Sequence, residues 1–158
     1  MSSTKLHLVG FTKLHNTLFH KISSRLMVHG KRAKAETILR EALLKVREES
    51  FGNAGGFPRT VLAAIVQVCP ALEVKSVRRG GGAFQVPFPL SRSRQLYMGL
   101  SWLVEGARIR RKKSSSSLKD ALAREILEAA HGKGWATTQR KAMHKKAVSN
   151  RAFKHFRW

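Results

Sequence analysis

Lysine and arginine side chains gather in stretches of this sequence that contain no carboxylate. The thirty residues after Glu128, the last acidic residue, carry eight of them. Residues 1–35 carry seven, residues 74–104 carry five and residues 106–119 carry six, again with no acid. A cation that contacts a phosphate releases counterions condensed on a nucleic acid, so such stretches suit a polyanion. The pattern therefore predicts a nucleic-acid partner.

The whole chain has a formal charge of +22 over 158 residues and a pI near 11.6. A compact protein with that charge repels itself unless an anionic partner compensates, and a basic surface kept for solubility needs far less. Hydrophobic residues still make up 42% of the sequence, enough for one domain with a buried core. We therefore expect a folded binding protein and not a disordered basic tail.

Residues that could do other chemistry are few. Cys69 is the only cysteine, which excludes an internal disulfide, and we expect it to pack as a small apolar side chain. His7, His15 and His20 lack a carboxylate or thiolate neighbour, so no metal and no cofactor are expected. Phosphate-loop, zinc-protease and serine-nucleophile motifs do not occur. Because these motifs are absent, catalysis is not expected. No apolar run approaches the roughly 20 residues that a membrane span requires, so a membrane partner is not expected either.

Hydrophobic periodicity predicts a mainly helical chain that positions the cations. Ser117 and Asp120 have the spacing of a helix cap, and Gly132 with Gly134 interrupts the chain after the helix that follows. Residues 1–25 have the composition of an organelle-targeting segment or belong to the first helix. Helices are expected at Leu14–Met27, from Ala35 to Val46, from Pro58 to Cys69, and at Arg92–Ile109, Leu118–Ala130 and Thr138–Ser149.

The same periodicity predicts which side chains are buried and which form pairs. Two core-facing stripes are expected, at Val61, Leu62, Ile65 and Val66 and at Ala142, Met143 and Ala147. Two ion pairs within one helix are expected, Glu36 with Arg40 and Glu41 with Lys45. The aromatic residues of the segment 150–158 are expected to dock it on the helix bundle, while its cations face phosphate.

Between residues 72 and 90 the hydrophobic pattern changes to the alternation of a strand, clearest from Phe84 to Leu90. Two prolines in this run exclude a central strand, because proline cannot donate a ladder hydrogen bond. Gly80 and the two glycines after it mark a turn that permits close approach of a ligand, and Arg78 and Arg79 precede it. We expect a two-stranded β-ribbon attached to the helices.

Five stretches together resemble the small-subunit ribosomal protein seven family, in the same order and at similar spacings. They are LMVHGKR at 26–32, EVKSVRRGGGAFQVP at 73–87, SRSRQLYMGLSWLVEGAR at 91–108, LAREILEAAHGKG at 122–134 and NRAFKHFRW at 150–158. The resemblance implies one domain over residues 1–158, a six-helix bundle with a protruding two-stranded β-ribbon, and no enzymatic activity.

The same resemblance implies a primary binder of the 3-prime major domain of small-subunit ribosomal RNA that nucleates assembly of the subunit head. It also implies contact with neighbouring head and platform proteins, and a ribbon near the exit-site tRNA and the mRNA exit path, with Arg78, Arg79 and Gly80 closest to them. The resemblance and the basic runs give the expected RNA-binding residues: Lys31, Arg32, Lys34, Lys75, Arg78, Arg79, Gly81, Gly82, Arg92, Arg94, Arg108, Arg110, Arg111, Lys112, Lys113, Arg140, Lys141, Lys145, Lys146 and Arg151.

The chain departs from bacterial members of that family at its beginning, where the mild MSSTKLHLVG replaces a dense arginine arm. Its later stretches are more similar to plant or algal mitochondrial members, so we expect a mitochondrial ribosome, with a plastid or the bacterial cytoplasm as the alternative.

Two rival functions belong to classes other than ribosomal proteins. A DNA-architectural protein would place one basic helix in a groove, and a membrane binder would expose large apolar side chains on a basic helix.

Overall fold

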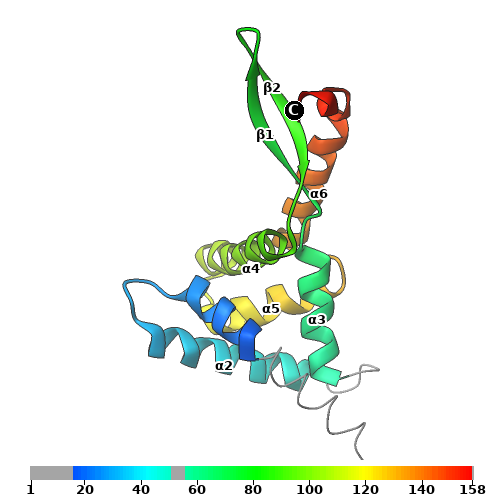
Figure 1. Ribbon diagram of the computed structural model, residues 1–158. Coiled ribbons are helices and arrows are strands. Elements are labelled where there is room, and N and C mark those ends of the chain that lie inside the picture. The colour runs from blue at the N-terminus through cyan, green and yellow to red at the C-terminus, as the bar shows by residue number, and fades with distance from the viewer. Residues whose placement is uncertain (1–15, 51–55, 158) are drawn as a thin grey trace, which may run out of the picture.

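The computed structural model describes residues 16–50 and 56–157. The fold is mainly helical with a two-stranded ribbon, as expected (Figure 1). After a first helix described over residues 16–26, the elements are α2 (Arg32–Glu49), α3 (Gly56–Val68), β1 (Leu72–Arg79), β2 (Gly82–Pro89), α4 (Arg92–Ser114), α5 (Leu118–Ala130), α6 (Trp135–Ser149) and the 3-10 helix η1 (Arg151–Arg157). The residues before 16, which hold most of the suggested targeting segment, and residues 51–55 lie outside the described part.

Helix α5 lies at the centre of the helix bundle, in contact with α2, α3 and α4. Leu39, Leu100 and Leu122, one from each of three helices, are almost completely buried there. Burying a leucine side chain stabilises a fold by about 1.5–3 kcal/mol, so these residues hold the helices together.

The expected burial of Val66 is wrong. Helix α3 buries Val61, Ala64, Ile65 and Val68, and Val66 lies off that stripe with 70% exposure.

Two ion pairs join α2 to α5. Glu41 pairs with Lys119 at 3.0 Å, and Lys45 pairs with Asp120. The expected pair between Glu41 and Lys45 is therefore wrong, because each side chain has an opposite charge on the neighbouring helix. The pair between Glu36 and Arg40 forms as expected, with a separation of 3.9 Å between its charged atoms.

The ends of the helices follow local signals where such signals exist. Helix α5 has the expected limits, and the Ser117 hydroxyl accepts the backbone N–H of Asp120 at its start. Helix α4 continues to Ser114, beyond the expected Ile109. Helix α6 begins at Trp135, three residues earlier than expected. Within the described ranges, no helix is long and apolar enough to cross a membrane.

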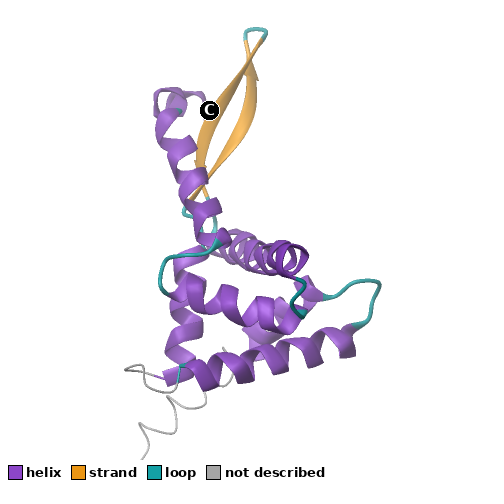
Figure 2. Cartoon of the chain, turned by 180° about the vertical axis from the view of Figure 1, so that it is seen from behind, coloured by secondary structure: helices purple, strands orange, loops and turns teal. Residues whose placement is uncertain are grey.

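The β-ribbon, α6 and η1 project together from the bundle, and we call this projection the arm (Figures 1 and 2). The ribbon pairs antiparallel from Leu72 opposite Pro89 to Arg79 opposite Gly82. Gly80 and Gly81 form its turn with φ of 54° and 82°. Positive φ at both central residues is the geometry of a two-residue hairpin turn, which favours glycine.

The C-terminal segment packs on the ribbon. The ring of Phe84 in β2 lies 5.3 Å from that of Phe153 and 4.9 Å from that of Phe156, measured between centroids. The Arg157 Nε donates a hydrogen bond to the Pro87 carbonyl at 2.7 Å. The expectation that this segment docks on the helix bundle is therefore wrong, because α6 leads it away from the bundle along the ribbon.

Helix α6 is buried in the bundle at its first turn, at Ala136 and Thr137, and Ala147 near its other end is also buried, on the arm. The inward placement of Ala142 is wrong, since its side chain is exposed, and Met143 is half-buried. Beyond its first turn α6 faces the narrow ribbon, which covers less of a helix than a bundle does. The base of the ribbon is held by His144, whose Nε2 accepts the Ala71 N–H at 3.0 Å.

Candidate nucleic-acid interface

The arm is the first of two basic surfaces. Its ribbon carries three lysines or arginines, α6 carries four and η1 carries three, against a single carboxylate, Glu73. Glu73 is buried at the base of the ribbon, where it pairs with Lys75 at 2.9 Å and with Arg94 of α4 at 3.6 Å. The rest of the arm therefore has no anionic group to offset its cations.

The second surface lies at the opposite end of α4, and we call Arg111, Lys112 and Lys113 the distal basic end. Beside it is a groove of about 700 Å³ whose walls include Arg111, Lys112, Ser115, Ser116 and the apolar Val28. An adjoining groove of about 450 Å³ also includes Lys112. A helix of the 23 residues of α4 is roughly 35 Å long, so this end lies about that far from the base of the arm.

The expected RNA-binding residues divide by what their charged groups contact. The first group is exposed, and within residues 16–50 and 56–157 the charged groups of its members make no ion pair or side-chain hydrogen bond. Its members are Lys31, Lys34, Arg78, Arg92, Arg111, Lys112, Lys113, Lys145, Lys146 and Arg151.

The second group already has partners inside the protein. Lys75 and Arg94 share Glu73, and Arg32 donates to Glu36 at 2.7 Å and contacts His20 at 3.0 Å. These groups remain partly exposed, so a phosphate would have to compete with a carboxylate for them. Such cations are expected to contribute less to binding than unpaired ones.

Four further cations of this group contact neutral or buried partners. Arg108 donates to the Arg25 and Leu26 carbonyls at 3.3 Å, where it caps the first helix. Arg140 donates to the Gln67 side chain at 3.4 Å, and Lys141 donates to the Gly132 carbonyl at 3.2 Å. Arg110 is held in the bundle by Glu125 and Glu128.

Because of these contacts, we leave Arg110 out of the interface. Burial alone would lower the pKa of Arg110, but its ion pairs with Glu128 and Glu125 raise that pKa above its ordinary value. Its side chain is 27% exposed. Arg110 thus compensates the buried carboxylate of Glu125 and the partly exposed one of Glu128, and it is not available to a phosphate.

The ribbon turn presents backbone as well as charge. Gly80 and Gly81 adopt the turn conformation, whereas Gly82 belongs to β2 and has no positive φ. A Cβ added at Gly80 or Gly81 would meet nothing within 4 Å, so the turn is open on its outer side. Arg78 and Arg79 are exposed immediately before it. The tip therefore combines two guanidinium groups with an accessible backbone.

Lys154, one of the cations of segment 150–158 that were expected to face phosphate, is exposed on η1 and adds to the arm. Sequence reasoning missed one feature of this region. Glu125 was assigned no role, yet its side chain is completely buried where α4, α5 and α6 meet. No signal in the sequence indicates this burial, because the three helices are brought together only by the fold.

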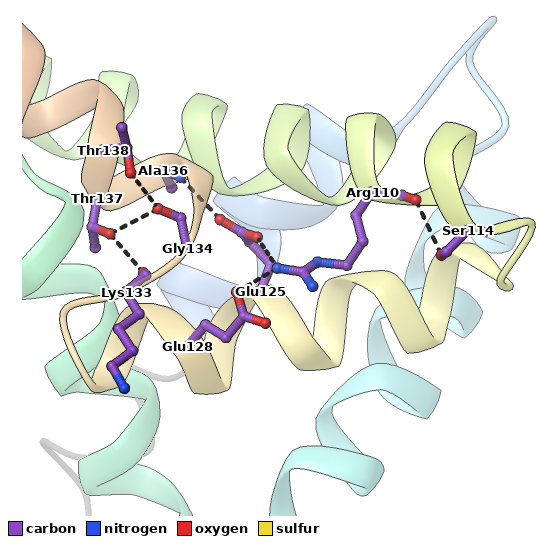
Figure 3. Close-up of polar contacts among 9 residues, drawn as sticks. All are labelled: Arg110, Ser114, Glu125, Glu128, Lys133, Gly134, Ala136, Thr137 and Thr138. Atoms are coloured by element: carbon purple, nitrogen blue, oxygen red, sulfur yellow. Dashed lines mark hydrogen bonds and ion pairs between the residues drawn. The ribbon is translucent and has the colours of Figure 1, made fainter.

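Figure 3 shows how Glu125 joins these three helices. One carboxylate oxygen, Oε1, accepts the backbone N–H of Ala136 in the first turn of α6 at 2.9 Å. The other, Oε2, accepts from Arg110 of α4 at 3.1 Å. The Thr137 hydroxyl donates to the Lys133 carbonyl at 2.6 Å and so fixes the turn before α6. We call this arrangement the junction.

The geometry suits binding of an extended polyanion and offers little for catalysis. Two exposed basic surfaces are carried by one scaffold, at the two ends of α4. In the part of the chain that the structure describes, no group of three histidine, cysteine or acidic residues could hold a metal ion. The fold and these surfaces define a helical scaffold protein with two separate cationic surfaces.

Comparison with known proteins defines the family. Residues 2–151 match the family described as Ribosomal protein S7p/S5e. A small ribosomal subunit protein uS7 from Beutenbergia cavernae is 42% identical over 139 residues, 87% of this chain and 85% of the relative. A protein of the same name from Latilactobacillus sakei is 40% identical over 145 residues, 91% of this chain and 88% of the relative. The chain belongs to the ribosomal protein S7p/S5e family, whose proteins are structural and not enzymes.

Proposed function

We propose that this protein is a structural constituent of the small ribosomal subunit that binds the 3-prime major domain of the ribosomal RNA and nucleates assembly of the head. The observation that carries this proposal is the separation, by about 35 Å along α4, of two basic surfaces that each carry unpaired cations: Lys145, Lys146 and Arg151 on one, and the distal basic end on the other. A DNA-binding helix, by contrast, is sized for one groove about 12 Å wide. A scaffold with two distant cationic surfaces can hold two RNA helices in a fixed arrangement.

Recognition in this proposal depends on shape and on phosphate positions. The deep major groove of an RNA duplex does not admit side chains, so proteins read its backbone and 2-prime hydroxyl groups. Lys145, Lys146 and Arg151 on the arm, with the distal basic end, supply unpaired cations for such contacts. Membership of the S7p/S5e family supports ribosomal RNA as the ligand.

The finer assignments extend the same proposal. The ribbon tip, with Arg78, Arg79 and Gly80, faces the exit-site tRNA and the mRNA exit path, and neighbouring head and platform proteins cover other parts of the surface. We retain the mitochondrial ribosome as the proposed location, on the acid-free composition of residues 1–35. The bacterial cytoplasm is the alternative, since both relatives described above come from bacteria.

A competition experiment tests the proposed ligand. Labelled transcript of the 3-prime major domain is bound by the purified full chain at physiological salt, and unlabelled RNA domain or duplex DNA of equal phosphate content is added. The RNA domain should displace the label at far lower concentration than the DNA does. Equal displacement would reject the proposal in favour of a general polyanion binder, and better displacement by DNA would indicate the DNA-architectural function.

The location is tested by sedimentation. The protein should comigrate with the small ribosomal subunit in a gradient at low salt, and its recovery from isolated mitochondria or from total cytoplasm distinguishes the two compartments. Recovery only at the top of the gradient would contradict a ribosomal role.

A further inference from the structure

Glu125 is a buried charged group for which RNA contact supplies no explanation. Its side chain is 0% exposed, so it cannot touch a ligand at the surface. A buried carboxylate carries a desolvation cost of several kcal/mol unless it is paired and hydrogen-bonded. Here both oxygens have partners, but the partners belong to different parts of the molecule: Arg110 of the bundle and Ala136 of the arm.

Two glycines leave the space that this carboxylate occupies. A Cβ added at Gly106 of α4 would lie 2.9 Å from Glu125 Cδ and Oε1. A Cβ added at Gly134, immediately before α6, would lie 3.0 Å from the same Oε1, and Gly134 also has φ of 89°. Real Cβ atoms almost never show the first of these separations, and the second is tighter than nine in ten real Cβ contacts. The backbones of α4 and of the turn before α6 therefore approach Glu125 so closely that a side chain at either position would force its neighbours to shift.

The contact between Glu125 and Ala136 lies at the only turn of α6 that is buried against α4 and α5 before the helix leaves with the ribbon. An oxygen at this place accepts a free N–H of the helix start and carries the negative charge that a helix N-terminus favours. The hydrogen bond therefore restrains the direction in which α6 leaves the bundle. Arg94 of α4 pairs with Glu73 at the base of the ribbon, and His144 joins α6 to that base. Arg140 of α6 also donates to Gln67 of α3, at 3.4 Å, which is longer than the 2.9 Å hydrogen bond to Glu125.

We propose that Glu125 is a positioning residue that fixes the arm relative to the distal basic end, so that both basic surfaces bind one folded RNA at the same time. This inference rests on the proposed function. When two binding surfaces are joined rigidly, the second contact forms at a high effective concentration, and the gain reaches about 10²–10⁴-fold. If the junction is loosened, the protein loses part of this gain in affinity, while each basic surface stays intact.

The variants distinguish the role of the junction from that of the ion pair with Arg110. Glu125→Gln keeps an oxygen that can accept the Ala136 N–H, but it places a neutral amide group next to Arg110. Glu125→Asp keeps the charge but is one methylene too short to reach both partners. Glu128→Gln is the matched control: it also removes a carboxylate from Arg110, but the Glu128 side chain is 40% exposed and has no hydrogen bond to α6. Circular dichroism and thermal unfolding establish that each variant folds.

The first measurement is the position of the arm, and it needs no RNA. Spin labels are attached at Ser76 in the ribbon and Leu44 in α2, both exposed, in a Cys69→Ala background. The distance distribution should be narrow in the parent protein and in Glu128→Gln, and broadened or displaced in Glu125→Asp and Glu125→Gln. A second pair within the bundle, at Leu44 and Arg124, should not change in any variant.

The second measurement is binding to two RNAs. One is a transcript of the 3-prime major domain, and the other is a short hairpin that a single basic surface covers. Both Glu125 variants should lose about tenfold or more in affinity for the domain, with the hairpin changed less than about twofold. Glu128→Gln should bind both RNAs as the parent does.

Two results would overturn the inference: a folded Glu125→Asp protein with the parent distance distribution, or equal losses of affinity for the domain and the hairpin. If Glu125→Gln does not fold, Glu125→Asp alone decides. A parent protein that fails to prefer the RNA domain would instead reject the proposed function, while the distance measurement would still report on the junction.

Discussion

Replacing Lys145 and Lys146 of α6 with alanine is expected to reduce the salt dependence of RNA binding by a calculable amount. Both side chains are exposed, and neither ammonium group is paired within the described residues. The slope of log affinity against log salt changes by about 0.9 for each phosphate neutralised on a duplex and about 0.7 on a single strand. Loss of two contacts should therefore reduce the slope by about 1.4 to 1.8.

A second pair of lysines supplies the control. Lys45 and Lys119 carry the same formal charge, but each is already paired with a carboxylate, Asp120 or Glu41, between α2 and α5. Changing both to alanine lowers the net charge by the same two units as the α6 variant does. Because these ammonium groups are already neutralised by protein, the salt slope should stay close to that of the parent.

The assay is filter binding of the 3-prime major domain transcript at several salt concentrations between about 50 and 200 mM, the range over which such contacts change affinity most visibly. Circular dichroism should show that both double variants keep the parent helix content. Equal reductions of the slope in the two variants would refute the reasoning, because net charge would then matter and the position of unpaired cations would not.

Three further changes test the packing. Gly106→Ala should cost up to about 2 kcal/mol in urea unfolding, because crowding of Glu125 (about 1–3 kcal/mol) equals or exceeds the roughly 1 kcal/mol that alanine gains in a helix; higher stability than the parent would contradict the close contact. Burial lowers the pKa of His144, whose neutral Nε2 accepts from Ala71. The unfolded state therefore takes up a proton first, and stability should fall as the pH drops below about 6.5, less so in His144→Gln; identical pH profiles would rule out this contribution. Phe84→Ala should release η1 and speed its amide hydrogen exchange, with α5 unchanged; a protected η1 would show that other contacts hold it.

Local signals in the sequence were enough to predict much of the fold. Helix α5 has a serine cap before it and glycines after it, and both of its limits were predicted correctly. The ribbon was predicted from alternation, paired glycines and prolines that suit edge strands. Helix α4 was predicted too short, because the charges at its end indicated termination, although cations in a last turn also stabilise a helix.

Contacts between distant segments could not be predicted in this way. Glu41 and Lys45 have ideal spacing for a pair within α2, but each found a partner on α5. The early start of α6 depends on Glu125, which is eleven residues upstream of Ala136 and lies on another helix. The aromatic side chains near the C-terminus were expected on the bundle, yet Phe84 of the ribbon was their partner.

The candidate site shows the same division. Charge runs identified the basic segments, and the resemblance to a family selected residues within them. Which cations are unpaired is a property of the assembled structure: Arg110 and Lys112 are two residues apart in one basic run, yet one is enclosed by carboxylates and the other lines a groove. Sequence spacing alone assigns both to the same surface.

The packing of η1 on β2 also orders events during translation. Between Pro89 and Arg151 lie 61 residues, which take about 3–12 s to synthesise at 5–20 residues per second. Throughout that interval the hairpin has no η1 to pack against, and a lone hairpin is only marginally stable in water. A nascent chain therefore cannot present the finished arm to RNA until residue 157 has been added, so engagement of the arm follows near-complete synthesis.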